Sequence, residues 1–212
     1  MHIRIALFVL LGFFFAAAPL SAQQRFGAGI VAGINVSQIQ GDDSAGYNRL
    51  GVRAGFRGIA RLTDRAEFGL DLLYSQRGST TELFPNNNFL RFVIHLDYIE
   101  VPVWFSYKDW LHPDGYYRIQ GFAGLSYGRL FNTRVEELVV IEDEQENFAK
   151  NDLSVTFGAS YRTGKRFSIG ANWTRSITPL YNNRRHLNNV GLPRYEYSLW
   201  GYFLSFQGVF EF

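Results

Sequence analysis

The stretch Trp200–Phe212, WGYFLSFQGVFEF, carries aromatic or apolar side chains at alternate positions. These positions are Trp200, Tyr202, Leu204, Phe206, Phe210 and Phe212, and the positions between them are mostly small or polar, with Phe203 and Val209 as exceptions. Successive side chains of a β-strand point to opposite faces, so this pattern predicts a strand with one apolar and one polar face. Strands of outer-membrane barrels have this pattern because lipid covers one face and a polar interior the other. A half-buried strand of a soluble barrel would alternate similarly.

The first residues, Met1–Ala22, have the pattern of a cleavable secretory signal peptide. Arg4 precedes an apolar run from Ile5 to Ala18, and small residues follow at Ser21 and Ala22. The run is shorter than the ~20 residues that a membrane-spanning helix needs. We therefore expect an exported chain whose mature domain is 23–212.

Composition excludes several classes of protein. Cleavage would remove Arg4 and leave 20 basic residues against 19 acidic ones. A nucleic-acid-binding protein would have a clear excess of basic residues, which this chain lacks. The chain has no cysteine, so it can form neither a disulfide framework nor a thiolate metal site. For the same reason it cannot be a lipoprotein, whose lipid is attached to a cysteine. Aromatic residues make up 17% of the chain and it holds 21 glycines, a composition that favours strands and turns.

Eight segments alternate with a period of two residues. They are Arg25–Ile39, Leu50–Leu62, Ala66–Arg77, Arg91–Tyr107, Tyr116–Phe131, Asp152–Arg162, Arg166–Thr178 and Arg194–Phe212. Three short connections (63–65, 108–115 and 163–165) alternate with four long ones (40–49, 78–90, 132–151 and 179–193). This predicts an all-β fold, an eight-stranded antiparallel up-and-down transmembrane β-barrel in the bacterial outer membrane, with both termini on the short-turn, periplasmic side.

A soluble lipocalin-like barrel is the structural alternative. Aromatic residues expected to point outward near strand ends favour the membrane barrel, because aromatic girdles mark both membrane interfaces. These residues are Tyr74, Trp104, Phe105, Tyr107, Tyr117, Tyr127 and Trp200.

The fourth segment breaks the alternation. Ile94 and Leu96 have one parity, whereas Val101 and Val103 have the other. An extra residue near Tyr98 or Ile99, a β-bulge, would bring both sets to the lipid face and turn His95, Asp97 and Glu100 inward.

Charged side chains recur on the inward faces of two neighbouring segments. Arg53, Arg57 and Arg61 follow one another at intervals of four, and Glu67 and Asp71 do so on the next segment. The interior of an eight-stranded barrel is just wide enough for side chains to fill it. We therefore expect a lumen charge network in which these five residues pair with one another and with Glu100, Arg118 and Arg162. The alternative is a selective pore lined by arginines.

Three other patterns resemble functional motifs. Gly124–Gly128 spells G-x-S-x-G, but it lies inside a predicted strand and not at the strand-to-helix turn that a nucleophile elbow needs. His95 and Asp97 could form a base and its orienting acid, yet no serine or second acid completes a catalytic arrangement. The third long loop holds Glu136, Glu137, Glu142, Asp143, Glu144 and Glu146 without EF-hand spacing. We predict no enzymatic activity, no metal and no cofactor.

Several stretches together resemble the PorT-type outer-membrane β-barrel family of Bacteroidetes-like bacteria. They are Phe26-Gly27 with Gly33–Ser37, Leu50-Gly51 with Ala54-Gly55, Leu72–Gly78, Tyr98–Pro102, Gly121–Gly128 and the terminal Phe212. The chain departs from that family at Asp71, where glutamate is expected, and in its acidic third loop. The resemblance implies an outer-membrane barrel and a role for Phe210 and Phe212 as the signal that the barrel-insertion machinery reads. It specifies fold better than activity.

Three functions follow as hypotheses. The preferred one is a non-enzymatic envelope component or scaffold that contacts outer-membrane lipid and another envelope protein, with a link to secretion implied by the resemblance alone. The alternatives are a small-solute channel and a lipid-modifying enzyme of the outer membrane.

Overall fold

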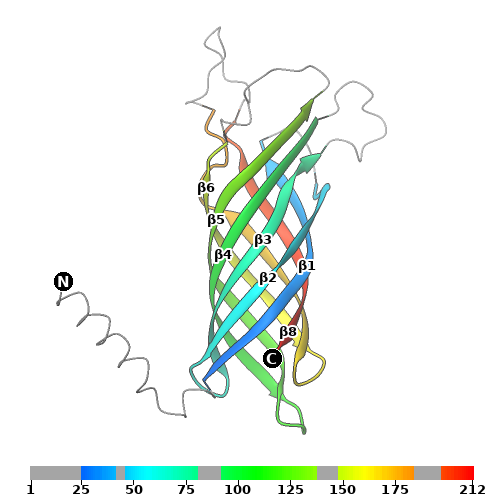
Figure 1. The fold of residues 1–212 in the computed structure, drawn as a ribbon, viewed down its shortest axis with the longest axis vertical. Helices are drawn as coiled ribbons and strands as arrows, with labels where there is room; N and C mark the ends of the chain where they lie inside the picture. The colour runs from blue at the N-terminus through cyan, green and yellow to red at the C-terminus, as the bar shows by residue number, and fades with distance from the viewer. Residues whose placement is uncertain (1–24, 42–45, 81–91, 138–147, 184–196) are drawn as a thin grey trace, which may run out of the picture.

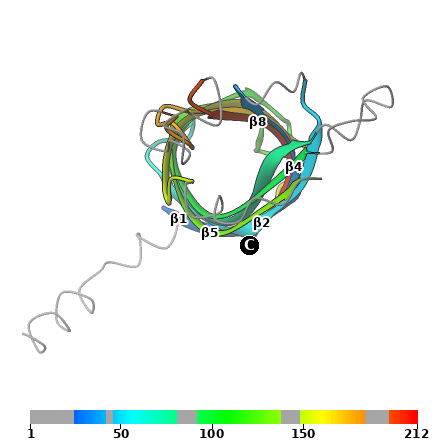
Figure 2. The ribbon, with the colours of Figure 1, turned by 90° about the horizontal axis from the view of Figure 1, so that it is seen from above.

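The computed structural model describes residues 25–41, 46–80, 92–137, 148–183 and 197–212, which form a closed barrel (Figure 1). Eight antiparallel strands follow one another around it in chain order, and β8 closes the ring by pairing with β1 (Figure 2). This confirms the predicted fold class. No helix in the described part of the chain is long and apolar enough to cross a membrane. The predicted signal peptide, 1–22, and residues 138–147 of the acidic loop lie outside the described residues.

The strands are close to the predicted segments. They are β1 (Phe26–Gln40), β2 (Arg49–Arg61), β3 (Ala66–Thr80), β4 (Phe92–Leu111), β5 (Tyr117–Glu137), β6 (Asn151–Arg162), β7 (Phe167–Ser176) and β8 (Trp200–Glu211). β4 runs further than predicted because Lys108–Leu111 continues the ladder with Tyr117–Gln120, which leaves a turn of 112–116. β5 runs further because Asn132–Glu137 pairs with Phe92–Asp97. The ladder of β8 begins at Trp200, later than the predicted Arg194.

The strands are staggered around the ring. One row of hydrogen-bonded partners starts at Val36 in β1 and passes through Leu204, Trp173, Phe157, Ala123, Phe105, Phe68 and Ala60. It returns to β1 at Phe26, ten residues before Val36. Such a stagger accompanies tilted strands, and an eight-stranded barrel of this kind has room inside for side chains only.

The short turns and the long connections lie at opposite ends of the barrel (Figure 1). The first residues of β1 and the last residues of β8 meet at the short-turn end, where the Phe212 amide donates to the Ala28 carbonyl at 2.9 Å. We call the other end the loop end.

Most side chains obey the predicted alternation. Outward positions are exposed and largely apolar, and aromatic residues gather there toward both ends, with Tyr107, Tyr161 and Phe167 at the short-turn end and Tyr74, Tyr127 and Trp173 at the loop end. Trp104 was expected to point outward, but it is 3% exposed and lies inside. Gly69 opposite makes room for it, since a Cβ there would lie 2.0 Å from the indole.

An irregularity is present near Tyr98, as predicted, but the prediction that the fourth strand holds the extra residue was wrong. β4 keeps one register with β3 from Ala66↔Tyr107 to Thr80↔Val93. The irregularity lies between β4 and β5, where Asp97 pairs with Asn132 and Tyr98 with Leu130, so the extra residue is Phe131 in β5.

Ile94 and Leu96 therefore point inward with Glu100, while His95 and Asp97 point outward. The prediction assumed that apolar side chains of a membrane strand must face lipid. Toward the loop end they instead fill the barrel's own interior.

Candidate functional site in the barrel lumen

The lumen is filled in successive layers, and the first lies at the short-turn mouth. Glu67, 1% exposed, accepts a hydrogen bond from Lys108 Nζ at 2.8 Å and another from Gln120 Nε2 at 3.2 Å. Arg61 Nε approaches the same carboxylate at 3.7 Å, and Arg162 pairs with Glu211 across the mouth. A polar pocket of about 610 Å³ opens here, so this layer is in contact with solvent.

The second layer is a buried ion pair that lies against an indole. Arg57 donates two hydrogen bonds to Asp71, from Nε at 2.8 Å and from Nη2 at 2.7 Å. The Trp104 Nε1 group donates to the same carboxylate at 3.3 Å, and its ring lies 4.7 Å from the Arg57 guanidinium carbon. β2 and β3 hold this geometry because Arg57 and Asp71 are direct partners in their ladder.

The third layer centres on Glu100, which is fully buried. Its Oε2 accepts from Arg53 at 3.0 Å and lies 2.9 Å from Arg77 Nη2, while its Oε1 accepts from the Ser126 hydroxyl at 2.7 Å. Arg77 Nη1 also donates to Asp152 Oδ2 at 2.8 Å. This chain of two arginines and two carboxylates links β2, β3, β4 and β6 across the lumen.

An apolar layer closes the lumen above these charges. The Arg77 guanidinium stacks on Phe203 at 4.1 Å and on Tyr98 at 4.7 Å, so cation–π contacts join the two layers. Beyond them lies a cluster of buried apolar residues, which we call the apolar seal: Ile39, Ile94, Leu96, Tyr98, Leu130, Phe148, Leu180, Tyr181 and Leu199. Residues of the long connections complete it, and backbone hydrogen bonds from Ala149 to Leu180 and from Leu180 to Leu199 hold them there.

The predicted network is thus present in part. Arg53, Arg57, Arg61, Glu67, Asp71 and Glu100 lie together in the lumen, and Arg162 lies at its mouth. Arg118 does not join them: its guanidinium lies 5.3 Å from the Trp110 ring near the β4–β5 turn, because the prolonged hairpin carries it away from the carboxylates.

Sequence reasoning missed Arg77, Lys108 and Asp152. Parity could have identified Arg77 and Asp152, since each has the inward parity of its own strand. Lys108 was assigned to a turn, so its inward position was not considered.

The family model of the outer membrane protein beta-barrel domain matches residues 21–182 of the 212. The chain belongs to this family. It is therefore an outer-membrane barrel, and its apolar outward face is the surface that meets lipid.

Solved structures of outer-membrane proteins resemble it at low identity. The attachment invasion locus protein Ail of Yersinia pestis is 11% identical, with a TM-score of 0.49, and the match covers 89% of this chain and 99% of that one. Neisserial surface protein A is 10% identical with a TM-score of 0.45, covering 87% and 97%. OprG from Pseudomonas aeruginosa is 11% identical with a TM-score of 0.39, covering 88% and 94%. No curated protein gives a significant match.

The two sequence patterns that resemble catalytic motifs, around Ser126 and around His95 and Asp97, do not form one catalytic arrangement in the barrel. Ser126 of the G-x-S-x-G stretch is in the middle of β5, buried, with its hydroxyl bonded to Glu100. His95 contacts Arg49. Asp97 accepts hydrogen bonds from Tyr74, Gln76 and Asn132 instead of orienting that histidine. No group of three or more potential metal ligands occurs among the described residues.

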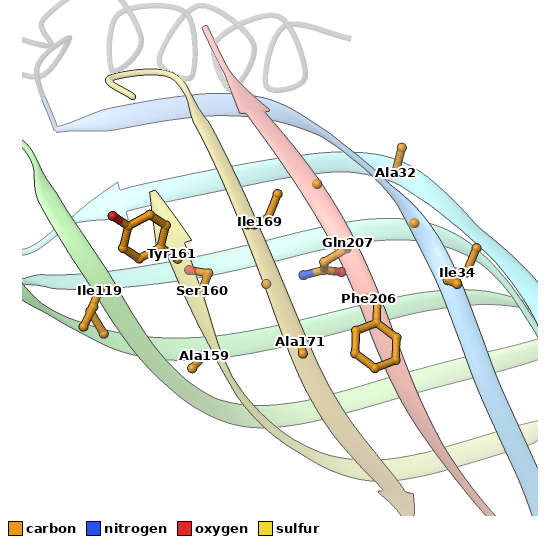
Figure 3. A pocket seen from close by; sticks show the side chains of 13 residues that line it. Ala32, Ile34, Ile119, Ala159, Ser160, Tyr161, Ile169, Ala171, Phe206 and Gln207 are labelled. Atoms are coloured by element: carbon orange, nitrogen blue, oxygen red, sulfur yellow. The ribbon is translucent and has the colours of Figure 1, made fainter. Parts of the chain in front are cut away.

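The lipid face carries a shallow groove of about 760 Å³ across β1, β8, β7 and β6 (Figure 3). Small residues such as Ala32, Ala159 and Ala171 lie along it, and Phe206 and Tyr161 stand beside them. Apolar side chains predominate around this groove, which suits acyl chains of the surrounding membrane.

Proposed function

We propose that this outer-membrane barrel is a non-conducting, non-enzymatic envelope component, and that it acts as a scaffold through its outer surface and its loop end. The observation that carries the proposal is the filled lumen. Two buried ionic layers and the apolar seal follow one another along the barrel axis. A solute crossing the lumen would have to separate paired charges and then push aside the buried apolar side chains of the seal.

The energetics of the buried ion pairs favour a plug over a pore. An arginine that lines a water-filled channel keeps hydration and stays available to a passing anion. Arg57 is 8% exposed and Arg53 is 3% exposed, and each donates to a carboxylate of this chain. Separating such a buried pair leaves a charge without its partner in a poorly hydrated place, which typically costs several kcal/mol.

The proposed scaffold has a defined orientation and defined partners. The short turns, the start of β1 and the end of β8 lie on the periplasmic side, as in other bacterial barrels, so the loop end faces the exterior. Barrel-insertion machinery engages β8 during assembly, and an envelope protein binds the mature barrel. The resemblance to PorT-type proteins supports a partner connected with secretion.

Conductance in planar bilayers tests the absence of a pore. Wild-type barrel should give no steady channel, whereas Leu96→Ser combined with Arg77→Ala, which opens the apolar seal and the layer beneath it, should give brief or noisy openings. Steady anion-selective channels in the wild type would replace this proposal with that of a channel.

Site-specific photocrosslinking in native membranes tests the scaffold role. A crosslinking residue at Tyr197, which lies at the loop end and is 62% exposed, should yield discrete adducts with another envelope protein. The same residue at Phe105, 50% exposed on the lipid face, serves as the control and should yield lipid adducts. Protein adducts absent from Tyr197 and from other loop-end positions would contradict a scaffold role.

A further inference from the structure

The polar pocket at the short-turn end, which we call the mouth pocket, carries two arginines on neighbouring strands. Arg61 ends β2, and its backbone N–H donates to the carbonyl of Arg25 at 2.7 Å. Phe26 and Ala60 are the next partners in the same ladder, so Arg25 and Arg61 lie directly opposite each other with the inward parity. Side chains at opposite positions leave the sheet about 5 Å apart, so two positive charges start from neighbouring points of the pocket wall.

The pair of arginines is only partly neutralised by this chain. Like charges directly opposite each other destabilise a sheet, and an anion between them removes the repulsion. The nearest carboxylate oxygen of Glu67 lies 3.7 Å from Arg61 Nε, but it is 2.8 Å from Lys108 Nζ and already accepts a hydrogen bond from it. Arg25 is exposed, and no described residue forms an ion pair with it. An anion that enters the mouth pocket can contact both guanidinium groups.

The remaining charges of the mouth pocket limit what kind of anion fits. Glu211 pairs with Arg162 across the mouth, and Asp64 is exposed in the β2–β3 turn. The described lining thus combines four cations with three carboxylates: Arg25, Arg61, Lys108 and Arg162 with Asp64, Glu67 and Glu211. Carboxylates repel a multiply charged anion such as phosphate, and they accept hydrogen bonds from N–H groups. The mixture favours a ligand that has one carboxylate and several N–H donors.

The β4–β5 hairpin supplies an aromatic wall of the mouth pocket, and it reaches beyond the other two short turns (Figure 1). Leu111 and Tyr117 are ladder partners with the outward parity, yet both line the pocket beside Tyr116. The alternation is interrupted at Trp110, whose φ of +61° lies in the left-handed region. No other residue in the described part of the chain, glycine apart, has a positive φ.

The backbone conformation of Trp110 is strained, because its Cβ crowds the following carbonyl oxygen. Such strain persists where the surrounding structure enforces it, and it is concentrated at functional sites. Here it accompanies the placement of two phenol rings, those of Tyr116 and Tyr117, beside the arginines. Phenol rings pack on apolar groups and also form hydrogen bonds, so this wall suits a chain of amino-acid residues.

We propose that the mouth pocket binds the carboxylate-bearing end of a peptide, with Arg25 and Arg61 on the carboxylate and the tyrosine wall against the adjoining residues. Its volume of about 610 Å³ is within the range of small-ligand sites. The pair of Arg57 and Asp71 closes the lumen behind it, so the peptide binds at the mouth and does not pass through. The site is independent of the scaffold role, and only its supply from the periplasm rests on the proposed orientation.

The terminal carboxylate should determine most of the specificity. A hydrogen bond to a charged group contributes about ten-fold or more in affinity. A peptide with a free carboxyl end should therefore bind about ten-fold more tightly than the same peptide with an amide end.

Ligand-observed NMR titration of the folded barrel in detergent can measure this preference. The probes are an N-acetylated tetrapeptide of three alanines and one phenylalanine with a free carboxyl end, and the same peptide with an amide end. The test variant is Arg25→Gln/Arg61→Gln. Its control is Lys165→Gln/Arg166→Gln, which removes two exposed positive charges at the same end of the barrel, in the β6–β7 turn outside the pocket lining.

The wild type and the turn control should prefer the free carboxyl end about ten-fold, and the test variant should bind the two peptides about equally. A test variant that keeps the wild-type preference would overturn the proposal, as would a wild type that binds neither peptide or both alike. Sodium acetate in ten-fold excess over the peptide should leave most of the peptide bound, because acetate lacks the contacts with the tyrosine wall. Complete displacement by acetate would mean that the pocket takes a free carboxylate and not a peptide. Heat-modifiable migration of each variant verifies that the barrel is folded.

Discussion

At the scale of single residues, the lumen arginines differ in what their loss would expose. Arg57 forms a bidentate pair with Asp71 inside the barrel, whereas Arg61 lies at the mouth, 38% exposed and 3.7 Å from Glu67. Glu67 would keep Lys108 as a partner, but among the described residues Asp71 would keep only the indole N–H of Trp104.

Arg57→Ala should therefore lower the free energy of unfolding by about 3 to 5 kcal/mol, because the buried carboxylate loses its counter-charge. Arg61→Ala should cost under about 1 kcal/mol, since solvent screens the remaining groups. Denaturant unfolding of both variants in the same lipid gives the comparison. Equal midpoints for Arg57→Ala and the wild type would mean that water, and not Arg57, stabilises Asp71.

The two faces of β8 give a second contrast between neighbouring residues. Leu204 lies outward between Val36 and Trp173, near the middle of the lipid-facing positions of β8, and Ser205 beside it is fully buried in the lumen. Leu204→Arg should cost about 2 to 4 kcal/mol through transfer of the charge into lipid.

Ser205→Arg should destabilise by a different route, the crowding of a filled interior next to Asn35, whose oxygen accepts from Ser205 at 2.7 Å. The penalty of Leu204→Arg should shrink in a thinner bilayer, whereas that of Ser205→Arg should not. Folding measured in lipids of two chain lengths distinguishes the two mechanisms, and equal dependence on thickness for both variants would be inconsistent with this assignment.

At the scale of elements, β8 combines closure of the barrel with a proposed role in assembly. Phe210 and Phe212 contact each other edge to face at 5.9 Å, and Phe212 is 68% exposed, so its side chain buries little area. Phe167, the ladder partner of Phe210, is a comparable exposed aromatic residue outside β8.

Phe212→Ala should reduce the amount of folded protein in the membrane several-fold while leaving its unfolding midpoint nearly unchanged. Phe167→Ala should affect neither quantity strongly. Quantification of membrane-inserted protein after a pulse of expression measures the first effect. If both variants accumulate like the wild type, Phe212 is not part of an assembly signal.

At the scale of the whole molecule, closure makes every strand depend on its two neighbours. All eight ladders are antiparallel and together close the ring, so within the barrel wall each strand is paired on both sides. The lumen contacts add cross-links between strands that are not neighbours, such as Arg77 to Asp152.

The barrel should therefore unfold as one unit and migrate as a compact species in detergent gels until it is boiled. Leu96→Ser should lower the temperature at which this compact band is lost, because it places a hydroxyl in the apolar seal. A temperature series on gels measures the transition. Gradual loss of the band through partly unfolded species would argue against cooperative closure.

The amino-acid sequence by itself determined the number of strands, the face that each residue occupies in most of them, and the alternation of short turns with long connections. These features are local: a two-residue period, as in Trp200–Phe212, survives whatever the strand packs against. The inward parity of Arg53, Arg57 and Asp71 was predictable for the same reason.

Only the tertiary structure decided which inward residues meet across the lumen and where the lumen is sealed. Arg77 reaches Asp152 because the ten-residue stagger brings β3 and β6 to the same depth, and no local pattern encodes that offset. Ile94 and Leu96 have the composition of a lipid-facing surface, yet they pack inside, since the barrel interior changes from polar to apolar toward the loop end. Periodicity identifies a residue's face, but the medium that this face meets depends on the closed barrel.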